Sequence, residues 1–150
     1  MTTRRTFLSL IAAAPVALTA LPAFAAKPET YATDGVAING YDPVAYFTQS
    51  DAVEGTTVHT SDHKGATYRF STAENKAMFD ADPVKFAPQY GGYCAYAVSK
   101  GSTATTSPDA WSVHDGKLYL NYNRVVRGIW KGDIPGNVAK ADANWPKVLQ

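Results

Sequence analysis

The fold is decided most clearly by the stretch Trp111–Leu120, which reads WSVHDGKLYL. Its centre, Asp115-Gly116, suits a type I′ turn, because both central residues of that turn need a positive φ angle. A two-residue loop there pairs His114 with Lys117, Val113 with Leu118, and Trp111 with Leu120. The apolar side chains of these pairs then share one face, so the hydrophobic pattern agrees with the register. The stretch predicts a β-hairpin with one buried face.

A second hairpin is predicted upstream, between Gly55 and Ser71. Residues 56–60 (TTVHT) are mostly β-branched, and residues 62–65 (DHKG) supply a turn. Tyr68 and Phe70 then alternate with polar positions, which is typical of a strand that buries one face.

Short helices are predicted around the two hairpins. Thr72 is expected to cap a helix that buries Phe79, and Asp82-Pro83 to start another that turns Val84 and Phe86 inward. Helical spacing recurs at Val125, Val126, Ile129 and Trp130 before Gly132, and again at Ile134, Val138, Ala141, Trp145 and Val148. No repeat or linker divides the chain, and Gly101–Ser107 reads as a surface loop. We therefore predict a small single α+β domain of antiparallel hairpins with short helices.

The leading segment, residues 1–25, has the features of a cleaved secretory signal. Arg4 and Arg5 precede an apolar run that ends in Ala23-Phe24-Ala25, a small-x-small cleavage site. The pair of arginines followed by Phe7 and Leu8 resembles a twin-arginine export signal. We expect a periplasmic protein with no membrane-spanning segment in the mature chain, because no second apolar run is long enough to span.

The charge balance excludes one class of partner. The chain carries 14 basic and 13 acidic residues, and removal of Arg4 and Arg5 leaves 12 against 13, a net charge of −1. Because no basic surplus remains to neutralise phosphates, we expect no nucleic-acid partner.

Soft ligands for a transition metal are few. They are His59, His63, His114, Cys94 and Met78. Residues four apart on a strand are separated by roughly 13 Å, too far for His59 and His63 to share one metal ion. Each histidine also reads as an ordinary strand or turn residue.

Cys94 is the strongest single candidate. It lies in QYGGYCAY (residues 89–96), where two glycines and three tyrosines surround it. A free cysteine is often an inert buried thiol, yet an unpaired cysteine in an exported protein is an oxidation liability. A soft-metal ligand and a reactive thiol both remain open.

No catalytic motif is visible in the chain. It contains no Gly-x-Ser-x-Gly elbow, no His-Glu-x-x-His and no glycine-rich phosphate loop. Aspartates such as Asp42 and Asp115 lie in turn or cap contexts, and the nine tyrosines resemble core material. We therefore expect a non-catalytic protein.

Several blocks resemble the YHS domain, in the same order. The blocks are GYDPVAYF (residues 40–47), HKGATYRFS (residues 63–71) and FDADPVKF (residues 79–86). Residues 90–95 (YGGYCA) and the 111–122 hairpin are similar to the longer, exported bacterial version of the family. The resemblance implies a YHS-like domain over residues 36–149.

The resemblance also implies a link to transition-metal handling, through members that carry cysteines. Their cysteines fall at positions that correspond here to Ala45, Ser71 and Asn75, so those ligands are absent from this chain. Cys94 lies outside that set.

The sequence thus favours a periplasmic, non-catalytic protein that binds a soft metal such as copper through Cys94. A histidine or Met78 would serve as the second ligand, because copper(I) prefers sulfur and tolerates few ligands. The alternatives are an interaction or scaffold module for a periplasmic protein partner, and, third, a thiol-dependent enzyme.

Overall fold

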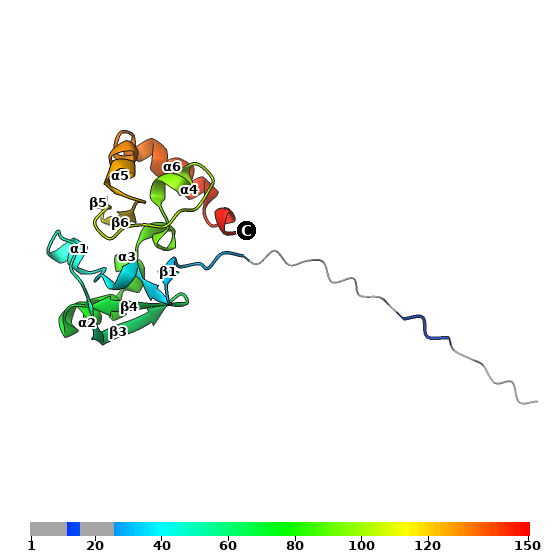
Figure 1. The fold of residues 1–150 in the computed structure, drawn as a ribbon, viewed down its shortest axis with the longest axis horizontal. Helices are drawn as coiled ribbons and strands as arrows, with labels where there is room; N and C mark the ends of the chain where they lie inside the picture. The colour runs from blue at the N-terminus through cyan, green and yellow to red at the C-terminus, as the bar shows by residue number, and fades with distance from the viewer. Residues whose placement is uncertain (1–11, 16–25) are drawn as a thin grey trace, which may run out of the picture.

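The computed structural model describes residues 12–15 and 26–150, and its elements are mixed helices and strands (Figure 1). The N-terminal half contains β1 (Ala32–Thr33), β2 (Val36–Ala37), the 3-10 helix η1 (Ile38–Gly40), α1 (Ala45–Thr48), β3 (Thr56–His63), β4 (Ala66–Phe70), α2 (Ala73–Ala81) and α3 (Pro83–Phe86). The C-terminal half contains η2 (Gln89–Gly92), α4 (Ala95–Ser99), β5 (Trp111–His114), β6 (Lys117–Leu120), α5 (Arg124–Lys131), α6 (Ile134–Asn144) and η3 (Lys147–Leu149). The predicted small α+β domain is confirmed.

The strands form two separate sheets. One has the order β1-β2-β4-β3, and the other is the β5-β6 hairpin. The β1-β2, β3-β4 and β5-β6 pairs are antiparallel, as expected for hairpins. In contrast, β2 pairs with β4 in parallel, with Val36 opposite Thr67. The hairpin patterns could not predict this pairing, because it joins strands that are distant in the sequence.

Both predicted hairpins form. The β5-β6 register places Trp111 opposite Leu120 and Val113 opposite Leu118, as predicted, and Asp115 has a φ angle of 49°. The β3-β4 turn is Lys64-Gly65, again with positive φ angles at both residues. His63 is therefore the last residue of β3, beside the turn.

The predicted helix caps are also confirmed. The Thr72 side chain accepts a hydrogen bond from the Asn75 N–H at the start of α2. Asp82 accepts one from the Lys85 N–H at the start of α3, where Pro83 is the first helical residue. Capping satisfies N–H groups that have no partner within the helix.

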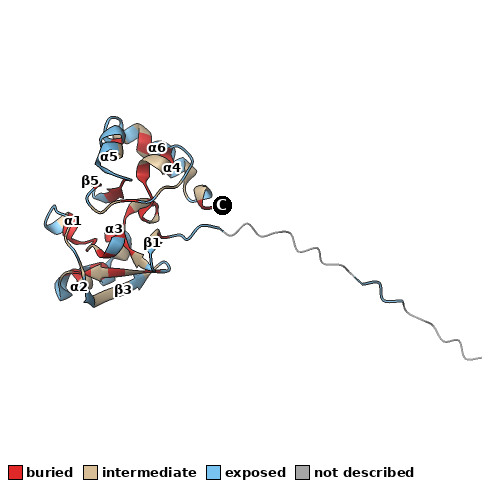
Figure 2. Cartoon of the chain, in the orientation of Figure 1, coloured by how far each residue is buried: buried red, intermediate tan, exposed pale blue. Residues whose placement is uncertain are grey.

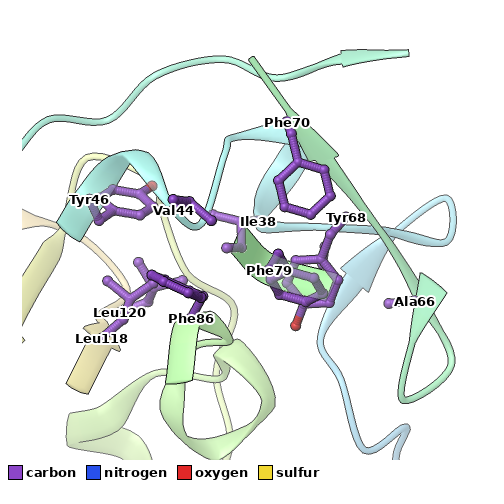
Figure 3. Packing of buried hydrophobic residues seen from close by; sticks show 11 residues of the cluster. Ile38, Val44, Tyr46, Ala66, Tyr68, Phe70, Phe79, Phe86, Leu118 and Leu120 are labelled. Carbon is purple, nitrogen blue, oxygen red and sulfur yellow. The ribbon is translucent and has the colours of Figure 1, made fainter. Parts of the chain in front are cut away.

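Buried side chains form two cores. The first lies under the four-stranded sheet and includes Tyr68, Phe70, Phe79 and Phe86, while the second includes Tyr90, Tyr119 and Trp130. Strand β6 belongs to both cores, because Leu118 and Leu120 face the first and Tyr119 faces the second. Figure 3 shows Leu118 and Leu120 beside Phe86 in the first core.

The sharing of β6 corrects the expectation of one buried face. Ser112 and Tyr119, on the face that the pattern leaves to solvent, are buried as well, whereas Val113 is partly exposed. The β5-β6 hairpin thus lies between the two cores, and its strand β6 is buried on both faces.

The predicted signal, residues 1–25, falls outside the described residues except for 12–15. Among the residues that the structure describes, no helix combines the length and the apolar character needed to cross a membrane.

Candidate functional site

A cleft of about 340 Å³ lies where the two cores meet. Its lining residues come from four parts of the chain: the end of the β3-β4 hairpin, the end of α6, the connection from α3 to η2, and the lead-in segment before β1. The lining residues are Glu29, Thr30, His63, Lys64, Tyr68, Val84, Ala87, Pro88, Gln89, Tyr90, Gly91, Asp142 and Trp145.

The exposure of Val84 explains why the sequence patterns did not predict this cleft. The position was predicted to face inward with Phe86, but Val84 is 69% exposed while Phe86 is buried. The prediction for Val84 is wrong because α3 is a single turn that buries only one of its apolar side chains. The exposed valine instead lines the cleft.

Part of the cleft lining is a segment of η2 with an unusual backbone conformation. Tyr90 and Gly91 adopt left-handed conformations, with φ angles of 56° and 60°. A tyrosine in this region carries a conformational cost of about 1–3 kcal/mol, so the surrounding packing must impose it. The ring of Tyr90 packs against Tyr119 and Trp145, and its hydroxyl donates to Asp142 Oδ1 at 2.9 Å.

The lead-in segment, residues 28–31, is held in place by hydrogen bonds to η2, to Tyr93 and to the β3-β4 turn. The Tyr31 N–H donates to the Gly91 carbonyl at 2.8 Å, and the Tyr93 hydroxyl donates to the Pro28 carbonyl at 2.8 Å. Thr30 Oγ1 donates to the Lys64 carbonyl at 3.0 Å. Residues 28–31 therefore connect the hairpin of the first core to the second core, although their sequence reads only as a polar lead-in.

The charged side chains that line the cleft do not fully cancel one another. Lys64 Nζ lies 3.3 Å from Glu29 Oε1, so these two charges largely cancel at the exposed mouth. Desolvation, and secondly the neighbouring Lys64 ammonium, lower the pKa of His63, which favours the neutral imidazole at pH 7. Burial and the hydrogen bond to Asp142 raise the pKa of Tyr90, so this phenol stays protonated. The net charge of the lining at neutral pH is that of Asp142.

A separate buried site is centred on Asp42. Its side chain is fully buried and accepts hydrogen bonds from the Val44 and Ala45 N–H groups at 2.9 and 3.3 Å. The other carboxylate oxygen accepts from the Ser71 N–H, the Ser71 hydroxyl and Asn75 Nδ2 at 2.8, 2.7 and 2.8 Å. The sequence identified Asp42 as a local turn residue, but only the structure brings Ser71 and Asn75 to it.

Cys94 is buried, with an exposed fraction of 2%. Its sulfur accepts a hydrogen bond from the Tyr122 N–H at 3.3 Å and lies 3.6 Å from Asn121 Oδ1 as a donor. Asn121 is itself fully buried and also accepts from the Tyr96 N–H. The thiol thus joins the start of α4 to the segment after β6.

The other predicted metal ligands lie on different elements from Cys94. His59 and His63 are on β3, Met78 is exposed on α2, and His114 lies at the β5-β6 turn. His114 Nε2 is 3.3 Å from Asp115 Oδ2. Across the described part of the chain, no three histidine, cysteine or acidic side chains are grouped as a metal site would need. His63 is the one of the five that lines the cleft.

The contacts of the thiol lead to a stability prediction. Cys94→Ser is expected to lower the free energy of unfolding by about 1–2 kcal/mol, because a shorter hydroxyl cannot hold both partners of the sulfur. Urea denaturation of the two proteins checks this value. An unchanged midpoint would mean that the sulfur contacts contribute nothing to stability.

An apolar stripe is formed by exposed residues of α5 and by Tyr122, which lies two residues before the helix. Tyr122, Val125 and Ile129 are 53%, 73% and 53% exposed, and Figure 2 shows α5 drawn mostly as exposed. The predicted helix is confirmed, but among its apolar residues only Trp130 is buried. Nothing in the described residues indicates what would cover this stripe.

Comparisons with known proteins identify no family for this chain, so its class of protein is described from the fold and the site. No family model, no curated protein and no solved structure matches the chain. The class that the fold defines is a small α+β domain with a cleft between two cores that share one hairpin.

Proposed function

We propose that the protein is a non-catalytic binding module that takes a small organic ligand in the cleft between its two cores. The observation that carries the proposal is the lining, in which Val84, Ala87, Pro88 and three aromatic side chains are joined by six polar or charged residues. Small-molecule sites in proteins combine apolar and aromatic surface with polar groups that fix the orientation of the ligand, and have a volume of roughly 300–1,000 Å³. They also occur preferentially between packed units, as here.

The same proposal places the protein among the exported YHS-like domains of the periplasm. Export rests on the leading segment, and the family rests on the ordered sequence blocks. One contact pattern supports the family. Ala45, Ser71 and Asn75, which correspond to the cysteine positions of the metal-handling members, all donate hydrogen bonds to Asp42. Positions that share a metal in relatives must lie together, and these three do.

Nuclear magnetic resonance with a set of small aromatic fragments tests the cleft. Fragments that bind are expected to shift the amide resonances of Tyr90, Gly91 and Lys64 more than those of α5. Val84→Trp fills the mouth of the cleft and is expected to weaken binding roughly tenfold, equivalent to about 1.4 kcal/mol. Because Val84 is exposed, this variant should fold normally.

Val125→Trp is the matched control, since Val125 is a similarly exposed valine on a short helix away from the cleft lining. It should bind fragments as the wild type does. Equal binding by both tryptophan variants, or shifts that map elsewhere, would exclude the cleft as the binding site.

The copper hypothesis stays a prediction, and the same protein preparation tests it. Elemental mass spectrometry of untagged protein would measure bound metal in the wild type and in Cys94→Ser. Near-stoichiometric metal that is lost in Cys94→Ser would support it. A metal-free wild type that takes up no copper(I) would reject it.

A further inference from the structure

We infer that the cleft selects a small organic cation, with the Asp142 carboxylate as the group that recognises the positive charge and the adjoining aromatic side chains as the surface for its apolar body. The inference rests on the proposed function, because it names the chemical class of ligand for the same cleft. It is carried by the placement of Asp142, by the absence of an ion pair to it among the described residues and by the aromatic groups beside it.

The position of Asp142 near the C-terminal end of its helix is electrostatically unfavourable for the helix. It lies in the last turn of α6, which ends at Asn144, and this turn contains no basic residue. The C-terminal end of a helix carries a partial negative charge, so a carboxylate there costs about 0.3–1 kcal/mol of helix stability. Asp142 is exposed at this helix end, and departures from such local preferences are characteristic of functional or strained sites.

Asp142 also lacks a counter-ion. In the described part of the chain its one polar side-chain contact is the Tyr90 hydroxyl, and none of the ion pairs includes it. A carboxylate can accept several hydrogen bonds, so capacity remains for an ammonium group.

The remaining charged groups of the lining do not oppose a cation. Lys64 is paired with Glu29 at the mouth, and the lowered pKa of His63 favours the neutral ring at pH 7. Asp142 therefore gives the cleft a net negative charge.

Aromatic side chains adjoin the carboxylate. Trp145 follows Asp142 by three residues, which sets the two on the same side of the helix end. The Tyr90 and Trp145 rings are 6.0 Å apart at a steep angle, and both line the cleft together with Tyr68. Aromatic surface beside a carboxylate is suited to an amine with an apolar body.

Three probes of similar shape and different charge test the inference. They are phenethylamine, 2-phenylethanol and phenylacetate, titrated at pH 7 into the full-length mature protein and followed by nuclear magnetic resonance. We expect the amine to bind about tenfold more tightly than the alcohol, because a charge-assisted hydrogen bond is roughly twice as strong as a neutral one. The anion should bind most weakly.

Asp142→Asn should remove the preference for the amine, so that the dissociation constants of phenethylamine and 2-phenylethanol differ by no more than about twofold. Asparagine keeps an oxygen for the Tyr90 hydroxyl, so the thermal midpoint should stay unchanged or rise slightly. Asp115→Asn is the matched control, since it loses the same charge at an exposed turn where asparagine is well tolerated. It should retain the preference for the amine.

The outcomes separate this inference from the proposed function. Equal binding of alcohol and amine in the wild type, or an unchanged preference in Asp142→Asn, would overturn the cation selectivity and leave the cleft as a binding site. Failure of all three probes to bind would overturn both.

Discussion

Asp42→Ala is expected to lower the free energy of unfolding by about 3–5 kcal/mol, the largest effect of a polar substitution in this protein. Five hydrogen-bond donors from three segments of the chain converge on this fully buried carboxylate. Alanine would remove the shared acceptor and leave Asn75 Nδ2 with only its longer contact to the Ser71 hydroxyl at 3.4 Å. Each buried donor left unsatisfied costs about 1–3 kcal/mol, and partial rehydration reduces the sum.

Urea denaturation measures this loss, with Asp51→Ala as the control. Asp51 is exposed, and among the residues that the structure describes it accepts a hydrogen bond only from its neighbour, the Ala52 N–H at 2.8 Å. Its removal should cost less than about 1 kcal/mol. A loss of similar size in the two variants would show that Asp42 is not the centre of a stabilising network.

The second large effect is expected at Gly91. Gly91→Ala should lower the free energy of unfolding by about 3–5 kcal/mol, because two penalties act together. The first is the left-handed φ angle of 60°, which costs an L-residue about 1–2 kcal/mol. The second is steric, since a Cβ atom at this position would lie 1.8 Å from the Glu29 carbonyl oxygen, far inside van der Waals contact.

Gly65→Ala separates these two penalties. Gly65 also has a positive φ angle, of 81°, but a Cβ atom there would have no neighbour within 4 Å. Its loss should be limited to the conformational cost, about 1–2 kcal/mol. Equal losses of stability in Gly65→Ala and Gly91→Ala would mean that the lead-in segment moves away from the added methyl group with no loss of folding free energy.

Gly91→Ala should also impair the cleft. The clash displaces Glu29 and weakens the hydrogen bond from the Tyr31 N–H to the Gly91 carbonyl, and Glu29, Thr30 and Gly91 all line the cleft. In the fragment titration, weaker binding by Gly91→Ala than by Gly65→Ala is the expected result. Unchanged binding would show that the lead-in does not shape the site.

Local signals predicted much of the fold. The Asp115-Gly116 turn set the pairing of Trp111 with Leu120, and Thr72 and Asp82 marked two helix starts that the structure confirms. Such signals work because a turn or a cap depends on the conformational preferences and hydrogen bonds of a few neighbouring residues.

The candidate site was much less accessible from the sequence. Of the five predicted metal ligands, His63 alone lines the cleft, and its neighbours there come from residues 29–30, 84–91 and 142–145. Their proximity arises from the packing of two cores against a shared hairpin. Periodicity within one segment carries no information about which other segment it will meet.

The hydrogen bonds of Asp42 likewise divide into local ones, which the sequence predicts, and long-range ones, which it does not. The bonds of Asp42 to the Val44 and Ala45 N–H groups follow from the turn sequence, whereas those from Ser71 and Asn75 require β4 and α2 to pack beside it. The residues of this chain dictate its hairpins, caps and mixed α+β character through short-range hydrogen bonding and alternation of apolar side chains. The cleft, the buried carboxylate network and the double burial of β6 depend on contacts between distant segments, which form only when both cores close.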